Sequence, residues 1–128
     1  MNPGSSPAFT LVDGHYAIVR LHADDAVTSW ARGSFLSITR TGEELSIVCE
    51  EGNVPDVVAD RGWRCLKLVG PFPLDQTGVA AAFTRVLADA GVALFVVSTY
   101  DTDYVLVRDG ILDHAVSALR EAGYVVRV

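Results

Sequence analysis

The order of apolar runs and turn-forming residues in the second half of the chain constrains the fold more than any other feature. The strand expected over residues 63–69 ends before Pro71 and Pro73, because proline has no backbone N–H to donate to a neighbouring strand. Apolar residues then recur twice at helical spacing, and each stretch ends at a glycine. An apolar hairpin lies between these helices. The expected elements are strands at 63–69, 92–100, 104–107 and 124–128, and helices at 79–90 and 112–122.

This β-α-β-β-α-β order is the split βαβ, or ferredoxin-like, pattern. The first half resembles a shorter copy, with strands expected at 15–21, 35–39 and 45–49 and a short helix over 24–30. We therefore predict an α+β protein of two tandem ferredoxin-like modules, with antiparallel sheets and helices on one face.

The predicted organisation is a flexible tail followed by two modules. Gly, Ser and Pro dominate residues 1–8, which we expect to form the tail. The first module is expected over residues 9–61 and the second over residues 62–128. Half of the 128 residues are hydrophobic, so a sizeable core can be buried.

Charge and hydropathy narrow the classes of partner. The net charge is −6, and the basic residues are dispersed, which disfavours nucleic acid and membrane surfaces as partners. No apolar stretch is long enough to cross a bilayer, and no signal peptide is evident. We expect a cytoplasmic protein.

The residues that usually carry chemistry are scattered. His15, His22 and His114 lie on different predicted elements, and Cys49 and Cys65 sit in separate strands without a nearby histidine. Two buried reduced thiols are favoured, and a disulfide or a metal pair is the alternative. Neighbouring carboxylates on a strand point to opposite faces, so they make poor acid–base pairs. We expect no catalytic residue, no metal and no cofactor.

The segment STYDTDYVLV, residues 98–107, is unusually polar for the end of an apolar strand. One interpretation is an ordinary hairpin turn in which Asp101 and Asp103 form Asx turns. The other is a polar rim whose carboxylates and Thr hydroxyls hold an ammonium or guanidinium group.

The segment PLDQTGVAAA, residues 73–82, links a strand to a helix. Asp75 and Thr77 are possible caps, and Gly78 opens the first turn. The alternative is an uncapped helix start that attracts a carboxylate. A free amino acid would suit both polar segments. We expect them to lie at opposite ends of the sheet, so that a shared pocket would need a neighbouring module.

Three stretches carry a family resemblance: FLSITRTGEELSIVCEE, RGWRCLKLVGPFPLDQTGV and VSTYDTDYVLV. They resemble small bacterial tandem ACT-domain proteins and the ACT modules of the cytosolic arginine sensor of animal nutrient signalling. The resemblance implies amino-acid binding at the seams between modules. It also implies which residues form the ligand site, namely Asp75, Gln76, Thr77, Gly78 and Val79 in the loop and Ser98, Thr99, Tyr100, Asp101, Thr102 and Asp103 in the hairpin.

In the animal sensor two tandem pairs of modules are fused, and this chain has one pair. The resemblance therefore further implies a homodimer, which would restore the four-module arrangement. The sequence thus predicts a non-catalytic regulatory sensor that binds an amino acid and signals to a partner protein. Two alternatives stay open. One is an interaction module without a ligand, and the other is a small enzyme that uses Asp101 or Asp103 as a base.

Overall fold

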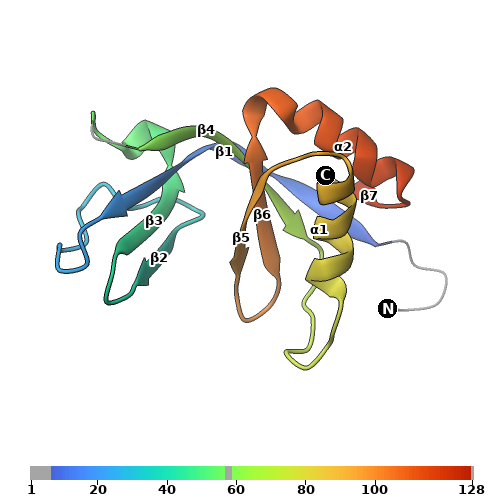
Figure 1. Cartoon of the computed structure of the whole chain (residues 1–128), viewed down its shortest axis with the longest axis horizontal. Coiled ribbons are helices and arrows are strands. Elements are labelled where there is room, and N and C mark those ends of the chain that lie inside the picture. The colour runs from blue at the N-terminus through green and yellow to red at the C-terminus, as the bar shows by residue number, and fades with distance from the viewer. Residues whose placement is uncertain (1–6, 57–58, 128) are drawn as a thin grey trace. The chain divides into compact units, whose positions relative to one another are not determined.

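The computed structural model describes residues 7–56 and 59–127 and divides them into two compact units (Figure 1). The unit named here the helical unit contains the described residues up to Asp13 and from Arg64 onward. The other, named the hairpin unit, is Gly14–Trp63. Residues 9–13, expected to open the first module, lie in the helical unit. Most of the predicted tail lies outside the described residues.

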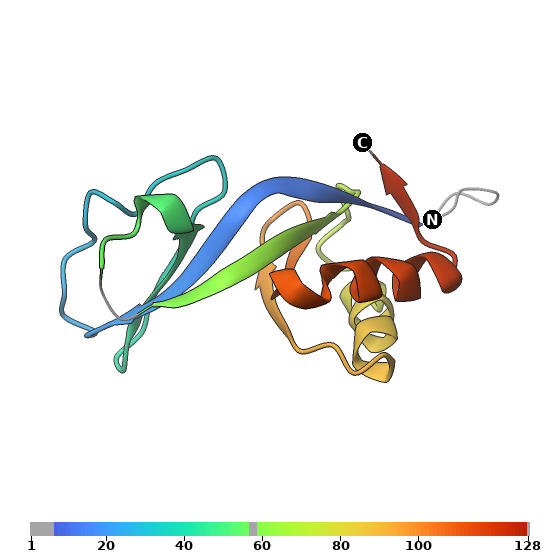
Figure 2. The same cartoon turned by 90° about the horizontal axis from the view of Figure 1, so that it is seen from above.

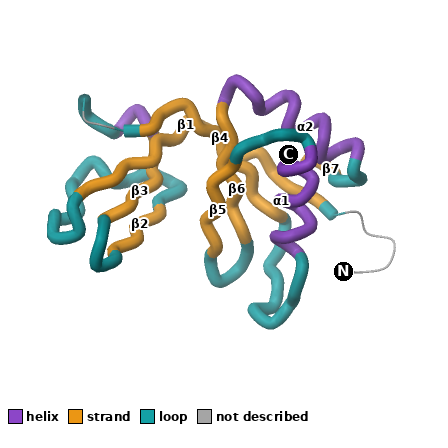
Figure 3. The backbone as a smooth tube through the Cα atoms, in the orientation of Figure 1, coloured by secondary structure: helices purple, strands orange, loops and turns teal. Residues whose placement is uncertain are grey.

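The helical unit contains the elements expected from the second half of the sequence (Figure 3). Both predicted helices and all four predicted strands are confirmed, with ends that shift by a few residues. The elements are β4 (Asp60–Leu68), α1 (Val79–Asp89), β5 (Leu94–Ser98), β6 (Asp103–Arg108), the 3-10 turn η2 (Asp109–Ile111), α2 (Leu112–Glu121) and β7 (Val125–Arg127). Strand β4 belongs to this unit from Arg64 onward.

The start of the chain completes the sheet of the helical unit. The strand order is β7-β1-β4-β6-β5, where β1 is Ala8–Leu21. Ala8 pairs with Val125 in a parallel register, so β1 separates β7 from β4. Helices α1 and α2 lie on one face of the sheet, as predicted for a ferredoxin-like fold (Figure 2).

The core of the helical unit lies between this sheet and the two helices. Phe9 of β1 is fully buried and meets Phe83 of α1 edge to face, with ring centroids 5.7 Å apart. Phe83 makes a similar contact with Tyr124 at 5.1 Å. The chain start is therefore part of this core. Its other buried members are Leu66, Leu68, Leu87, Val92, Val105, Val107, Leu112, Ala115 and Leu119.

The hairpin unit consists of antiparallel strands and turns. Strand β3 (Leu45–Glu50) pairs on one side with β1 and on the other with β2 (Ser37–Arg40), and the 3-10 turn η1 (Glu51–Asn53) follows. The predicted hairpin is confirmed. Its core is made by Ala17, Val19, Leu45, Ile47, Cys49 and Val54.

The helix predicted over 24–30 is wrong, since these residues form turns and irregular backbone. The carboxylate of Asp25 accepts a hydrogen bond from the His22 amide at 3.0 Å. The Arg40 guanidinium donates to the Ala23 and Asp25 carbonyls. The local bond from His22 to Asp25 and the longer-range bonds from Arg40 occupy backbone groups that a helix would use.

The burial of Phe9 makes the start of β1 essential to the helical unit. We expect Phe9→Ala to lower the free energy of unfolding by about 3–5 kcal/mol, because it leaves a cavity against Phe83. Urea denaturation followed by circular dichroism measures this. Leu11→Ala is the matched control, since Leu11 on the same strand is 37% exposed, and should cost under about 1 kcal/mol. Equal losses for the two variants would contradict the placement of Phe9.

Candidate functional site

The two polar segments lie at the same end of the helical unit's sheet (Figure 1). The expectation that they lie at opposite ends is wrong. Helix α1 returns the chain across the sheet, so that β4 and β5 run in the same direction. The loop after β4 and the turn after β5 therefore come together.

Residues of both polar segments line one pocket of about 260 Å³, and all of its lining residues belong to the helical unit. Asp75 and Thr77 do not line it. The predicted residues that do are Gln76, Gly78, Val79, Ser98, Thr99, Tyr100, Asp101, Thr102 and Asp103.

Sequence reasoning missed five lining residues: Phe72, Pro73, Leu74, Ala80 and Ala81. The first three precede Gly78 in the loop, and their apolar side chains gave no reason to expect them in a binding site. Ala80 and Ala81 were within reach of prediction, because the first turn of any helix has free backbone amides.

The helix start in this pocket is uncapped. Gly78 is the N-cap residue, with φ of +83°, and no side chain caps the helix. The predicted capping by Asp75 or Thr77 is therefore wrong. The first turn also carries no acidic side chain. The amides of residues 79–81 thus remain available, and the positive end of the α1 dipole borders the pocket.

The turn between β5 and β6 is built by threonines. The Thr99 amide donates to the Thr102 carbonyl at 2.8 Å, and the Thr102 amide donates to Thr99 Oγ1 at 3.3 Å. Asp103 accepts a hydrogen bond from Ser98 Oγ across the strand pair. Asp101 is exposed. The Asp103 carboxylate thus has one oxygen engaged by Ser98, and the Asp101 carboxylate is exposed.

Two hydrogen bonds join the turn to the end of β4 and to the loop that follows it. The Phe72 amide donates to the Asp101 carbonyl at 2.8 Å, and Thr102 Oγ1 donates to the Leu68 carbonyl at 2.9 Å. Thr102 is 6% exposed. A Cβ at Gly70 would lie 3.1 Å from the Asp101 oxygen. The loop and turn therefore approach so closely there that a side chain would require its neighbours to shift.

The pocket presents groups of complementary polarity. Asp101 and Asp103 supply negative charge opposite the positive helix end, and no basic side chain lines the pocket. Among the described residues, no group of three His, Cys, Asp or Glu side chains is placed to hold a metal. Cys65 is buried, and its desolvation raises the pKa of the thiol to about 12. This thiol is therefore protonated and not nucleophilic at neutral pH.

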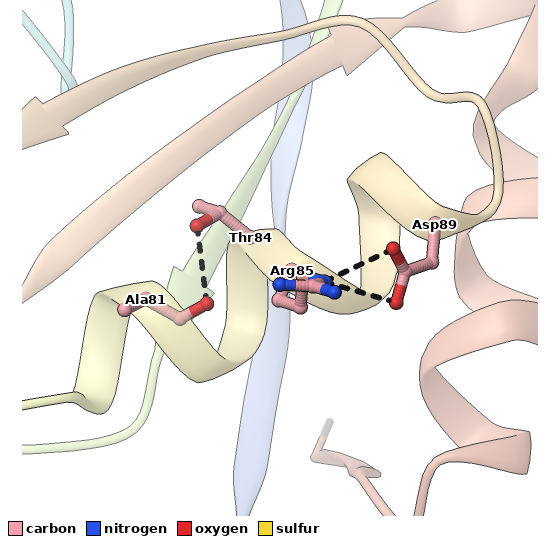
Figure 4. A network of polar contacts seen from close by, with 4 residues as sticks. All are labelled: Ala81, Thr84, Arg85 and Asp89. Atoms are coloured by element: carbon pink, nitrogen blue, oxygen red, sulfur yellow. Dashed lines mark hydrogen bonds and ion pairs between the residues drawn. The ribbon is translucent and has the colours of Figure 1, made fainter.

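The polar residues farther along α1 bond within the helix (Figure 4). Thr84 Oγ1 donates to the Ala81 carbonyl at 3.4 Å, and Arg85 Nε lies 3.0 Å from Asp89 Oδ1. The Asp89 side chain is 66% exposed. Asp89 is thus a carboxylate of the same unit that does not line the pocket.

Comparison with known proteins identifies the class. A model of the ACT domain matches residues 58–121, and a second family model, of an N-terminal domain, matches residues 14–57. Since the ACT match covers half of the chain, the protein belongs to the ACT domain family. Its ferredoxin-like α+β architecture agrees with this.

Two curated relatives and one solved structure show the likeness in detail. Human "Putative protein CASTOR3P" is 33% identical over 93 residues, covering 62% of this chain and 57% of that protein. The Bos taurus cytosolic arginine sensor for mTORC1 subunit 1 is 31% identical over 115 residues, covering 85% of this chain and 29% of that protein. The chain therefore spans only part of both relatives.

The solved structure is that of protein Atu0741 from Agrobacterium tumefaciens. It is 41% identical, with a TM-score of 0.89, and the match covers 97% of this chain and 94% of that chain. Among the described residues, no helix has the length and apolar character needed to cross a membrane.

The close approach at Gly70 gives a test of how the site is held. We expect Gly70→Ala to destabilise the protein by about 1–3 kcal/mol, because the new Cβ disrupts the hydrogen bond from the Phe72 amide. Hydrogen exchange should become faster at Phe72. Gly42→Ala is the control, because a Cβ there meets nothing within 4 Å. Unchanged exchange at Phe72 would contradict the close approach.

Proposed function

We propose that this protein is a non-catalytic regulatory sensor that binds a free amino acid in the pocket between α1 and the β5–β6 turn. The observation that carries the proposal is the meeting of an uncapped helix start and two carboxylates in one pocket of about 260 Å³. A zwitterion carries the matching charges. The similarity to a protein named as an arginine sensor supports the same assignment.

The ligand carboxylate would lie against the first turn of α1. The amides of Val79, Ala80 and Ala81 border the pocket and have no side-chain cap. Gly78 adopts a positive φ that suits glycine, and a Cβ there would meet nothing within 4 Å. Its role is thus conformational, because other residues are strained in this backbone region.

The ligand ammonium group would lie against the β5–β6 turn. Asp103 is held by the Ser98 hydroxyl, and Asp101 follows the exposed Tyr100. A carboxylate fixed by a neighbouring hydroxyl loses little freedom when it accepts a charged hydrogen bond. Two carboxylates also suit a ligand with a second cationic group, such as a guanidinium.

The proposed assembly is a cytoplasmic homodimer in which a second copy covers the pocket. Leu74 and Tyr100 line the pocket and are 72% and 78% exposed. Large apolar side chains left in water at a pocket rim are typical of an interaction surface. Ligand binding would favour one arrangement of the two copies, and a partner protein would read that arrangement.

The second candidate is an interaction module that binds no amino acid. The exposure of Leu74 and Tyr100 favours it as much as the sensor. It would form the same dimer without responding to ligand, so a ligand screen separates the two functions.

A thermal-shift screen of the twenty standard amino acids tests the sensor. At about a hundred times its Kd, a ligand stabilises the folded state by about 2.7 kcal/mol. For a chain of this size we expect a rise in Tm of about 10 °C. No shift with any amino acid at about 10 mM would contradict the proposal and favour the interaction module.

Substitution of Asp103 tests the ammonium site. Asp103→Ala should weaken binding of the amino acid found in the screen by roughly 10- to 150-fold, because it removes a charge-assisted hydrogen bond. Isothermal titration calorimetry measures the Kd. Asp89→Ala removes an equivalent charge away from the pocket and should leave the Kd unchanged. An equal Kd of this amino acid for Asp103→Ala and for the unaltered protein would contradict the assignment of Asp103 to the site.

Substitution at the rim tests the dimer. We expect Leu74→Glu to convert the dimer to a monomer, because it places a charge in the proposed apolar contact. Light scattering after size exclusion measures the mass. Val27→Glu is the control, since Val27 is 46% exposed on the hairpin unit. A monomeric unaltered protein, or a dimer that survives Leu74→Glu, would overturn this arrangement.

A further inference from the structure

The helical unit contains a second, larger pocket beside the proposed amino-acid site. Its volume is about 510 Å³, within the range of small-molecule sites. It lies among the ends of strands β1, β4 and β7, the loop after β4, and α1. Its lining residues are Pro7, Ala8, Leu68, Val69, Pro71, Phe72, Gln76, Val79, Ala82, Tyr124 and Arg127.

The walls of this pocket are mostly apolar. Prolines, aliphatic side chains and Phe72 make up most of the lining, and Gln76, Tyr124 and Arg127 are the lining residues with polar side chains. Burial of an apolar ligand surface against these walls would be favourable. The pocket therefore suits a ligand with a hydrocarbon or aromatic body.

A single cationic side chain lines this pocket. Among the described residues, no carboxylate lies within ion-pair distance of the Arg127 guanidinium. This is notable in a chain of net charge −6. A guanidinium presents paired donors that match a carboxylate. Arg127 therefore offers a planar anion a site at the edge of an apolar pocket.

Tyr124 adds a further polar side chain to the lining of this pocket. Its ring packs edge to face against Phe83, and its amide is bonded to the Leu119 carbonyl. Desolvation raises the pKa of Tyr124, so its hydroxyl is protonated and can donate at neutral pH. The pairing of Ala8 with Val125 holds β7 in place beside β1.

We propose that this pocket binds a small apolar carboxylic acid, with the hydrocarbon body among the strand ends and α1 and the carboxylate on Arg127. Neither the family match nor the similar proteins assign a ligand here. The site adjoins the amino-acid pocket, since Phe72, Gln76 and Val79 line both, but Arg127 and Tyr124 line only the larger one.

Calorimetric titration of octanoate into the full chain tests the proposal. We expect saturable one-site binding that Arg127→Gln weakens about tenfold and Arg127→Lys restores in part. Octan-1-ol should bind with similar affinity to the unaltered protein and to Arg127→Gln. Ala82→Phe should abolish octanoate binding by filling the pocket, and Ala8→Phe provides a second filling variant if the first fails to fold. Arg85→Gln is the charge-matched control, because Arg85 is exposed and does not line this pocket, and it should leave the octanoate affinity unchanged.

No octanoate heat at about 10 mM would overturn the proposal, as would binding that persists in both filling variants. An unchanged octanoate affinity in Arg127→Gln would overturn the assignment of the carboxylate. Ala82 does not line the amino-acid pocket. The thermal shift caused by an amino acid should therefore persist in Ala82→Phe, so that failure of one site is distinguished from failure of the other.

Discussion

The site depends on the hydrogen bond from the Phe72 amide to the Asp101 carbonyl. This bond joins two segments that are about thirty residues apart in sequence, and the buried bond from Thr102 to the Leu68 carbonyl supports it. Gly70 allows the approach because no side chain stands between the backbones. The uncapped start of α1 and the acidic turn can therefore border one pocket.

Periodicity and turn residues predicted most of the helical unit. The apolar spacing from Val79 and from Leu112 identified both helices, because one face of each packs on the sheet. The extension of β1 back to Ala8 was not predicted, since Asp13-Gly14 is a typical turn signal. In the structure Gly14 has φ of +100° and the strand continues through it. Strand pairing of β1 with β4 and β7 outweighs the local turn preference, and no local pattern reports such pairing.

The site was predicted in composition but not in geometry. Most of the expected residues line the pocket, because polar side chains at the ends of apolar strands have few structural reasons to be there. Their common location depends on the direction of the crossover through α1, which the sequence argument assigned wrongly. The contribution of Phe72 and Leu74 to the pocket lining could not be predicted from the sequence, because neither side chain carries a polar group.

The central claim is that one ligand engages both segments at once. Titration of the uniformly ¹⁵N-labelled protein with the amino acid identified by the thermal-shift screen tests it directly in amide correlation spectra. The account predicts that the amides of residues 79–81 and of residues 101–103 shift together, with the same apparent Kd. Shifts confined to one segment, or different Kd values for the two, would contradict it.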